Sequence, residues 1–133
     1  MARRRKQDPP PPPLHELEAE VMDAVWSRGE VSVRDVMETL NARTSARDRA
    51  YTTFLTTMAR LDAKGLLQRR REGKTDFYAP VFSREEYRAL RAGADVEALV
   101  SEYGDVALSH FARQMARLDP AHVRELERIA RGG

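Results

Sequence analysis

The 133-residue sequence predicts a mainly α-helical fold, in which three short helices precede a β-hairpin and three further helices follow it. Two observations support this fold class. Apolar residues recur at spacings of three and four along most of the chain, which is the period of an amphipathic helix. Residues 66–81 instead form two short runs around a glycine-bearing turn, which is typical of a β-hairpin.

The first expected helix runs from Leu14 to the residue before Gly29, because glycine commonly follows a helix C-terminus. Its apolar stripe comprises Leu14, Leu17, Val21, Met22, Val25 and Trp26. Residues 1–13 precede it and are expected to form a flexible basic, proline-rich tail. Five consecutive prolines at 9–13 favour polyproline II and exclude a helix there.

The second and third helices are expected on either side of a polar, basic loop at residues 42–50. Residues 30–31 form a short extended segment, and Ser32 with Asp35 approximates a capping box for a helix that ends near Asn41. The third helix spans about 51–64 and ends at Gly65. Its inward positions are Phe54, Met58 and Leu61. Its opposite face carries Thr52, Thr56, Ala59 and Ala63, flanked by Leu55 and Arg60.

The hairpin strands are expected at 66–71 and 75–81, and Pro80 predicts that the second strand lies at or near a sheet edge. Ser83 and Glu86 form a full capping box that starts the fourth helix. Gly93 and Gly104 are candidate kinks or ends. A fifth helix carries Leu108, Phe111, Ala112 and Met115, and the sixth starts at Asp119-Pro120 and carries Val123, Leu126 and Ile129.

Charge is distributed unevenly along the chain, although the net charge is only +2. Residues 14–42 hold two arginines and seven acids, whereas residues 43–74 hold nine bases and three acids. Such asymmetry in a small domain is typical of a phosphate-binding face. The alternative is a solvated charged surface with no binding role.

Three helices followed by a basic hairpin predict a winged helix–turn–helix that binds double-stranded DNA. The slim, hydroxylated face of the third helix suits a major groove, and the hairpin suits contact with the DNA backbone or minor groove. The candidate DNA-binding residues are Arg49, Tyr51, Thr52, Thr53, Leu55, Thr56, Arg60, Lys64, Arg69, Arg70, Arg71 and Lys74. The tail is either merely flexible or an arm whose Arg3, Arg4, Arg5 and Lys6 add non-specific DNA affinity.

The C-terminal helices have too little core to be stable alone, so their stripes predict pairing with a second copy. The alternative is that they pack back onto the winged helix of a monomer. The candidate dimerisation residues are Tyr87, Leu90, Leu99, Val100, Leu108, Phe111, Met115 and Leu126. The domains are then the tail at 1–13, a DNA-binding domain at 14–82 and a dimerisation region at 83–133.

Several strings in this order resemble the BlaI/MecI/CopY family of bacterial repressors, over about residues 14–130. They are 16–26 (ELEAEVMDAVW), 31–36 (VSVRDV), 50–61 (AYTTFLTTMARL), 64–66 (KGL), 71–74 (REGK), 77–80 (FYAP) and 83–87 (SREEY). The resemblance implies a homodimer joined by the C-terminal helices on a dyad operator with TACA/TGTA-like halves. It also implies repression of genes for β-lactam resistance, copper handling or a neighbouring membrane metalloprotease.

The resemblance further implies release by proteolysis, through a membrane metalloprotease sensor pathway that leads to a cut at an Asn-Phe bond. The matching position here is His110-Phe111, which departs from that pattern. The copper branch uses a C-terminal cysteine cluster, and this chain has no cysteine, so it does not resemble a copper sensor.

Enzymatic function is not expected. His15, His110 and His122 lack metal-ligand spacing, and neither a P-loop nor a nucleophile elbow is present. We therefore expect no catalytic residues, metal or cofactor, no insertion into a membrane, and a cytoplasmic protein. Two other functions remain open: a winged-helix adaptor that binds another protein, and a winged-helix regulator that senses a small ligand directly.

Overall fold

The computed structural model describes residues 8–43 and 48–132, so the basic residues of the proposed N-terminal arm lie outside it. Contacts between residues divide the chain into two compact units, Met1–Ala92 and Gly93–Gly133. The elements follow the predicted order, and the mainly α-helical class with one hairpin is confirmed.

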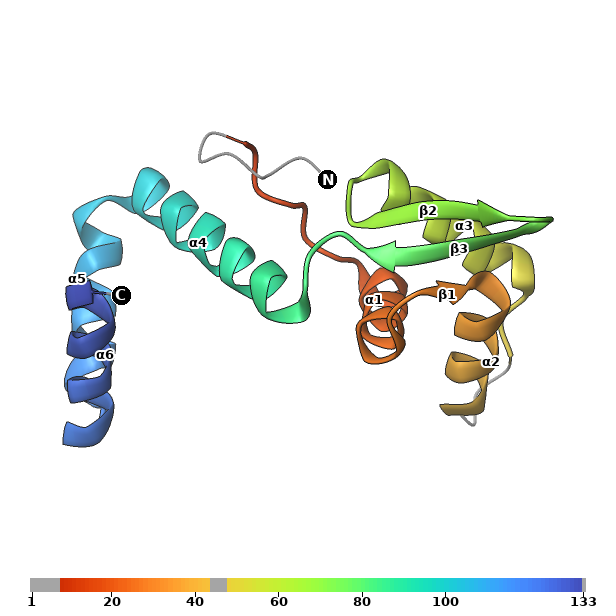
Figure 1. Cartoon of the computed structure of the whole chain (residues 1–133). Helices are drawn as coiled ribbons and strands as arrows, with labels where there is room; N and C mark the ends of the chain where they lie inside the picture. The colour runs from red at the N-terminus through yellow and green to blue at the C-terminus, as the bar shows by residue number, and fades with distance from the viewer. Residues whose placement is uncertain (1–7, 44–47, 133) are drawn as a thin grey trace. The chain divides into compact units, whose positions relative to one another are not determined.

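The first unit contains three helices and a small sheet (Figure 1). Its elements are α1 (Glu16–Arg28), β1 (Val31–Ser32), α2 (Val33–Arg43), α3 (Tyr51–Ala63), β2 (Leu67–Glu72) and β3 (Thr75–Pro80). The three helices contact one another, and the sheet packs against α1 through β3 and against α3 through β2. This arrangement buries one face of each helix.

The helix boundaries follow from local capping. Ser32 Oγ accepts a hydrogen bond from the Asp35 N–H (3.1 Å), and Asp35 Oδ2 accepts one from the Ser32 N–H (3.0 Å), so the predicted capping box of α2 is confirmed. Helix α1 ends before Gly29, whose φ of +88° is a conformation that favours glycine.

The sheet is antiparallel with the strand order β1-β3-β2. Gly73, with φ +62°, is the first residue of the two-residue turn between Glu72 and Thr75, as in a type II′ hairpin. The sequence predicts that strand β3 lies at or near a sheet edge; it is instead the central strand of the three, although only β2 pairs with it at Pro80. Pro80 is tolerated there since β1 pairs only with Phe77 and Tyr78 and ends before reaching it.

The core of the first unit contains the predicted apolar stripes of its helices together with side chains from the hairpin. The buried apolar residues are Val21, Met22, Ala24, Val25, Val31, Val33, Val36, Leu40, Phe54, Met58, Leu61, Leu66, Leu67, Tyr78 and Tyr87. The inward positions predicted for α3 are therefore confirmed. Their burial fixes which face of α3 remains exposed.

Helix α4 (Arg84–Tyr103) starts at the predicted capping box, in which Ser83 Oγ accepts the Glu86 N–H (3.1 Å). Its first turns belong to the winged unit. The Tyr87 ring lies 5.5 Å from that of Trp26, and Trp26 Nε1 donates to the Phe82 carbonyl (2.9 Å). Tyr87 is only 8% exposed, so its side chain is used inside its own subunit; its assignment to a dimer interface stays a prediction.

The proline segment also packs on α4. Tyr87 Oη donates to the Pro12 carbonyl (2.8 Å), Arg91 Nη1 donates to the Pro11 carbonyl (3.0 Å), and Pro11 is buried. The end of the predicted tail, at residues 11 and 12, thus contacts the winged unit in this structure. Polyproline II leaves its carbonyls without internal partners, so they are free to accept these side chains.

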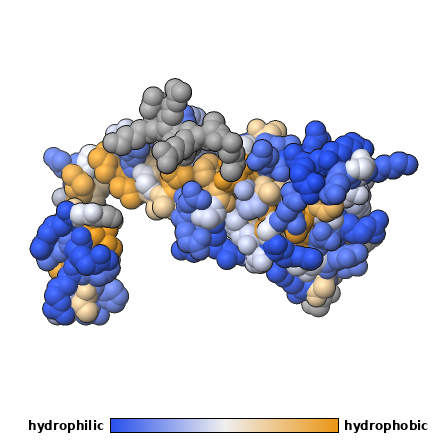
Figure 2. Space-filling view, in the orientation of Figure 1, coloured by the Kyte–Doolittle hydropathy of each residue, from blue (hydrophilic) through white to orange (hydrophobic). Residues whose placement is uncertain are grey.

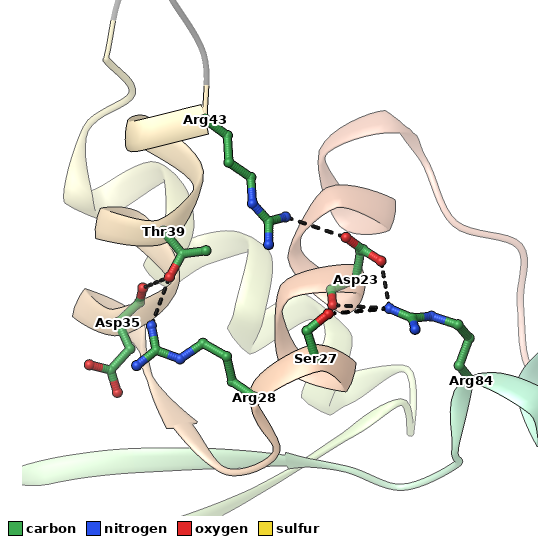
Figure 3. A network of polar contacts seen from close by, with 7 residues as sticks. All are labelled: Asp23, Ser27, Arg28, Asp35, Thr39, Arg43 and Arg84. Atoms are coloured by element: carbon green, nitrogen blue, oxygen red, sulfur yellow. Dashed lines mark hydrogen bonds and ion pairs between the residues drawn. The ribbon is translucent and has the colours of Figure 1, made fainter.

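A polar network joins α1 to both α2 and the start of α4 (Figure 3). Asp23 accepts hydrogen bonds from Arg43 at the end of α2 (3.3 Å) and from Arg84 (2.6 Å). The Arg84 guanidinium also lies over the Trp26 ring, 5.7 Å from its centroid. These contacts fix the linker between β3 and α4 on the surface of the winged unit.

The second unit consists of the rest of α4, α5 (Asp105–Ala116) and α6 (Pro120–Gly132). Helix α4 runs through Gly93 and ends before Gly104. Asp119 caps α6 as predicted, because its Oδ1 accepts the His122 N–H (2.9 Å). No described residue of α5 or α6 is buried, and Figure 2 shows hydrophobic surface beside charged surface on these helices.

Candidate nucleic-acid interface

The exposed face of α3 is small, hydroxylated and partly aromatic. Thr52, Thr56, Ala59 and Ala63 are all exposed, as predicted from their position opposite the core. Tyr51 (43% exposed) and Leu55 (40% exposed) lie beside them. No charged side chain occupies the centre of this face, so another surface can approach the helix backbone closely.

The hydroxyls of α3 are not equivalent. Thr57 is buried, and its Oγ1 donates to the Thr53 carbonyl within the helix (2.8 Å). Thr53 is exposed. The hydroxyls available to a ligand are therefore those of Thr52, Thr53 and Thr56.

Two surface hollows border α3. We call the first the α1 hollow; its lining residues are His15, Leu17, Glu18, Thr52, Thr53, Thr56, Thr57 and Arg60. We call the second the wing hollow; its lining residues are Ser32, Val33, Arg34, Tyr51, Leu55, Lys74, Thr75 and Asp76. The threonine face of α3 thus borders one hollow, and the start of the helix borders the other.

Lys64, a candidate DNA-binding residue, has a carboxylate partner within the folded chain. Its Nζ lies 2.8 Å from Oε2 of Glu18, which is 2% exposed. The Glu18 carboxylate also accepts the His15 N–H (2.9 Å). The structure thus uses Lys64 to pair a buried charge that joins α1 to the end of α3.

The Glu18 carboxylate should make the free energy of unfolding depend on pH in the acidic range. Burial acts to raise the pKa of Glu18, but hydrogen bonds from Lys64 and His15 outweigh it and hold the pKa below its ordinary value. A group whose pKa is lowered by folding stabilises the protein above the ordinary glutamate pKa, about 4.3, and this contribution is lost as the pH falls through the folded value.

We therefore expect Glu18→Gln to lower the free energy of unfolding at pH 7 by about 1–3 kcal/mol, since it removes one partner of a buried charged hydrogen bond. The difference from wild type should shrink as the pH falls below about 4. Urea titrations at several pH values would measure it. Glu16→Gln, at an exposed position of the same helix, is the control and should change stability little. Equal losses for both variants at pH 7 would contradict the role of the pair.

Two other candidate cations have acidic partners. Arg49 Nη1 lies 3.4 Å from Glu20 Oε2. Arg70 donates to both carboxylate oxygens of Glu30 (2.7 and 3.0 Å) and to Glu72, and its guanidinium lies 5.2 Å from the centroid of the Phe77 ring. The Arg70 hydrogen bond lowers the pKa of Glu30. The sequence alone grouped Arg69, Arg70 and Arg71 as equal candidates for phosphate contact. The structure distinguishes Arg70 from the other two, because Arg70 is paired with Glu30 and Glu72.

The alternation of strand β2 separates Arg69 and Arg71 from Arg70. Arg69 is opposite Tyr78 and Arg71 is opposite Asp76, whose Oδ1 lies 4.0 Å from Arg71 Nη1. Both arginines are exposed. They remain the wing residues best placed to meet a DNA backbone.

Arg34 is a lining residue that the sequence reasoning missed. It follows the capping residue Ser32 at the start of α2 and is exposed in the wing hollow. The capping box at Ser32 and Asp35 predicted that Arg34 lies in the first turn of a helix. Only the fold shows that this turn and Lys74 of the hairpin line the same hollow.

The described ranges, 8–43 and 48–132, contain no cluster of three or more His, Cys, Asp or Glu side chains that could hold a metal ion. None of the helices in that part of the chain is long and apolar enough to cross a membrane.

A three-helix unit with an exposed third helix, followed by a three-stranded sheet with a basic hairpin, defines the winged-helix class of DNA-binding proteins. The family model described as "Penicillinase repressor" matches residues 14–131. The chain belongs to the penicillinase repressor family, and it is a BlaI-like transcriptional repressor rather than an enzyme.

The chain is also similar to a curated relative and to two solved structures. The transcriptional regulator BlaI of Mycobacterium tuberculosis (strain CDC 1551 / Oshkosh) is 43% identical over 107 residues, which cover 77% of this chain and 73% of that protein. The solution structure of the DNA-binding domain of the repressor BlaI matches with a TM-score of 0.50 and 26% identity, over 58% of this chain and 90% of that one. The Bacillus licheniformis BlaI monomeric form in complex with the blaP half-operator matches over the same shares at a TM-score of 0.47.

Proposed function

We propose that this repressor binds operator DNA with α3 in the major groove and the β2–β3 hairpin against the adjacent backbone. The observation that carries the proposal is the exposed face of α3, which presents Thr52, Thr56 and small alanines opposite a fully buried core face. Such a face fits a major groove about 12 Å wide, where threonine methyl and hydroxyl groups meet thymine methyls and base edges.

The same proposal includes assembly as a homodimer through the C-terminal helices. Within 41 residues of the second unit, large apolar side chains are exposed, and a hollow is lined by Leu99, Tyr103, Val106, Ala107, His110, Phe111 and Gln114. Solvent-exposed apolar patches of this kind mark association surfaces. A second copy is the occupant that gives a two-fold repressor on a dyad operator.

Besides Tyr87, which is buried in its own subunit, the interface candidates are Leu90, Leu99, Val100, Leu108, Phe111, Met115 and Leu126. Among them Leu99, Leu108 and Phe111 are more than half exposed within the single chain (52%, 53% and 60%). These three side chains would bury the most apolar surface if a partner subunit covered them.

Release by proteolysis at His110-Phe111, through a sensor pathway, stays a prediction. The bond lies in the middle of α5, and both side chains are exposed. Cleavage there would divide the proposed interface, because Phe111 lines the hollow described above and also a second apolar hollow. The residues of that second hollow are Val96, Leu99, Val100, Ala107, Leu108 and Phe111.

Base reading by α3 predicts that Thr52→Ala or Thr56→Ala weakens binding to an operator selected from a random DNA library by about 1–3 kcal/mol each. Binding to random DNA should change much less, because phosphate contacts are kept. Fluorescence anisotropy on both DNAs measures the ratio. Thr57→Val is the matched control: its hydroxyl is used inside the helix, so the ratio should stay at the wild-type value. Equal losses on both DNAs would show that α3 does not read bases.

A winged-helix adaptor for another protein is the competing function. DNA binding through phosphates releases counterions, so the logarithm of the binding constant falls with the logarithm of the salt concentration by about 0.9 per phosphate. An adaptor should show no such binding, and a slope near zero with random DNA would favour it.

A further inference from the structure

We propose that one backbone phosphate of each operator half-site binds in the wing hollow, between the side chains of Arg34 and Lys74. The inference rests on the proposed DNA-binding function and names a phosphate site within it. It also adds Arg34, at the start of α2, to the DNA-contacting residues.

The first step is the state of the cations around α3. Lys64, Arg70 and Arg49 each have a carboxylate partner in the folded chain. The side chains of Arg34 and Lys74, in contrast, make no hydrogen bond or ion pair with any other residue in the described ranges. Exposed cations left unpaired keep their full charge for a phosphate, whereas a paired cation must first give up its partner.

The second step is that the fold gathers these two cations in one place. Arg34 is in α2 and Lys74 is in the β2–β3 turn, yet both line the wing hollow together with Tyr51 and Leu55 of α3. The hollow therefore continues directly from the face of α3 that is proposed to enter the major groove. A phosphate held in this hollow would lie on the DNA backbone that borders the major groove occupied by α3.

The third step is the polar lining of the hollow. Ser32, Tyr51 and Thr75 contribute hydroxyl groups, and Ser32 Oγ accepts the Asp35 N–H, so its own proton remains available to a phosphate oxygen. One carboxylate, Asp76, also lines the hollow, but it lies 4.0 Å from Arg71 Nη1, which offsets its charge. The hollow has a volume of about 410 Å³, more than ten times that of a water molecule in the liquid (about 30 Å³), so it admits a sugar–phosphate unit.

The test uses the full chain and an operator duplex selected from a random library. Single phosphates are replaced, one position at a time, by uncharged methylphosphonates, and binding is measured for the wild type and for an Arg34→Gln/Lys74→Gln double variant. For the wild type, several positions in each half-site should lower affinity, because Arg69 and Arg71 are also expected to meet the backbone, and one of these positions is the phosphate of the wing hollow. The double variant should bind the unmodified operator more weakly and should be indifferent to methylphosphonate at that position.

The salt titration gives a second readout. Losing one phosphate contact in each of two half-sites should reduce the log–log salt slope by about 0.9 per contact, or by nearly two in total. Arg88→Gln is the matched control, because Arg88 is an exposed arginine of the same unit that has no ion-pair partner in the described ranges and lines neither hollow. Its slope and methylphosphonate profile should equal those of the wild type.

Two outcomes would overturn the phosphate site while leaving the proposed function intact: a double variant with the wild-type methylphosphonate profile, or an equal drop in slope for Arg88→Gln. A wild-type slope near zero would instead overturn the DNA-binding function itself. Circular dichroism of the double variant should match the wild type, since both substitutions are at exposed positions without native partners.

Discussion

Replacing Phe111 by glutamate is expected to convert the proposed homodimer into a monomer and to weaken operator binding by about 10²–10⁴-fold. Phe111 is 60% exposed in the single chain and does not belong to the buried core, so each subunit should stay folded after the substitution. In a dimer it would place a charge in an apolar interface, at a large desolvation cost. The monomer then loses the second half-site, which the dimer engages at high effective concentration.

Sedimentation equilibrium at micromolar concentration measures the first effect, and titration with full-operator and half-operator duplexes measures the second. Ser109→Glu is the matched control, since it adds the same charge at an exposed polar position of α5 and should leave the dimer intact. Half-operator binding should be nearly equal for all three proteins. A Phe111→Glu protein that still sediments as a dimer would exclude α5 from the interface.

The second large effect is expected at the core of the winged unit. Phe54→Ala should lower the free energy of unfolding by about 3–5 kcal/mol, because the side chain is fully buried where α3 meets α1 and α2. For a unit of this size each kcal/mol shifts the melting temperature by about 4–8 °C, so the transition should move down by well over 10 °C.

The neighbouring residue supplies the control for Phe54. Leu55 is 40% exposed and flanks the outward face of α3, so Leu55→Ala should lower the melting temperature much less than Phe54→Ala does. It should instead weaken operator binding, because Leu55 borders the wing hollow and the proposed groove-facing surface. If both variants melted alike, the assignment of one face of α3 to the core and the other to DNA would be wrong.

The contacts of α4 set the boundary between the DNA-binding part of the chain and the proposed dimerisation part. The division between the compact units falls between Ala92 and Gly93, later than the boundary predicted at residue 83. The difference arises because Tyr87 and Arg91 bind the proline segment and Arg84 binds Asp23. A DNA-binding fragment should therefore extend to Ala92, since ending at residue 83 would remove these contacts from the winged unit.

The sequence by itself determined the helices, their capped starts and the two faces of α3. Ser32, Ser83 and Asp119 each bind backbone groups within three residues, and the apolar period of a helix is likewise local. Such features are visible in any short window of the chain, so the order of elements and the winged-helix class followed from them. The family-like strings at 50–61 and 71–80 fall on α3 and the hairpin for the same reason.

Only the tertiary structure decided which charges are free and which side chains are internal. Lys64 pairs with Glu18, 46 residues away, and Arg70 with Glu30, 40 residues away, so a count of basic residues does not show which cations are unpaired in the folded chain. Tyr87 belongs to the core because Trp26 and Pro12 reach it, and β3 is central because a two-residue β1 pairs with it. In each case the deciding partner is distant in sequence, and its position depends on how the helices pack rather than on any local pattern.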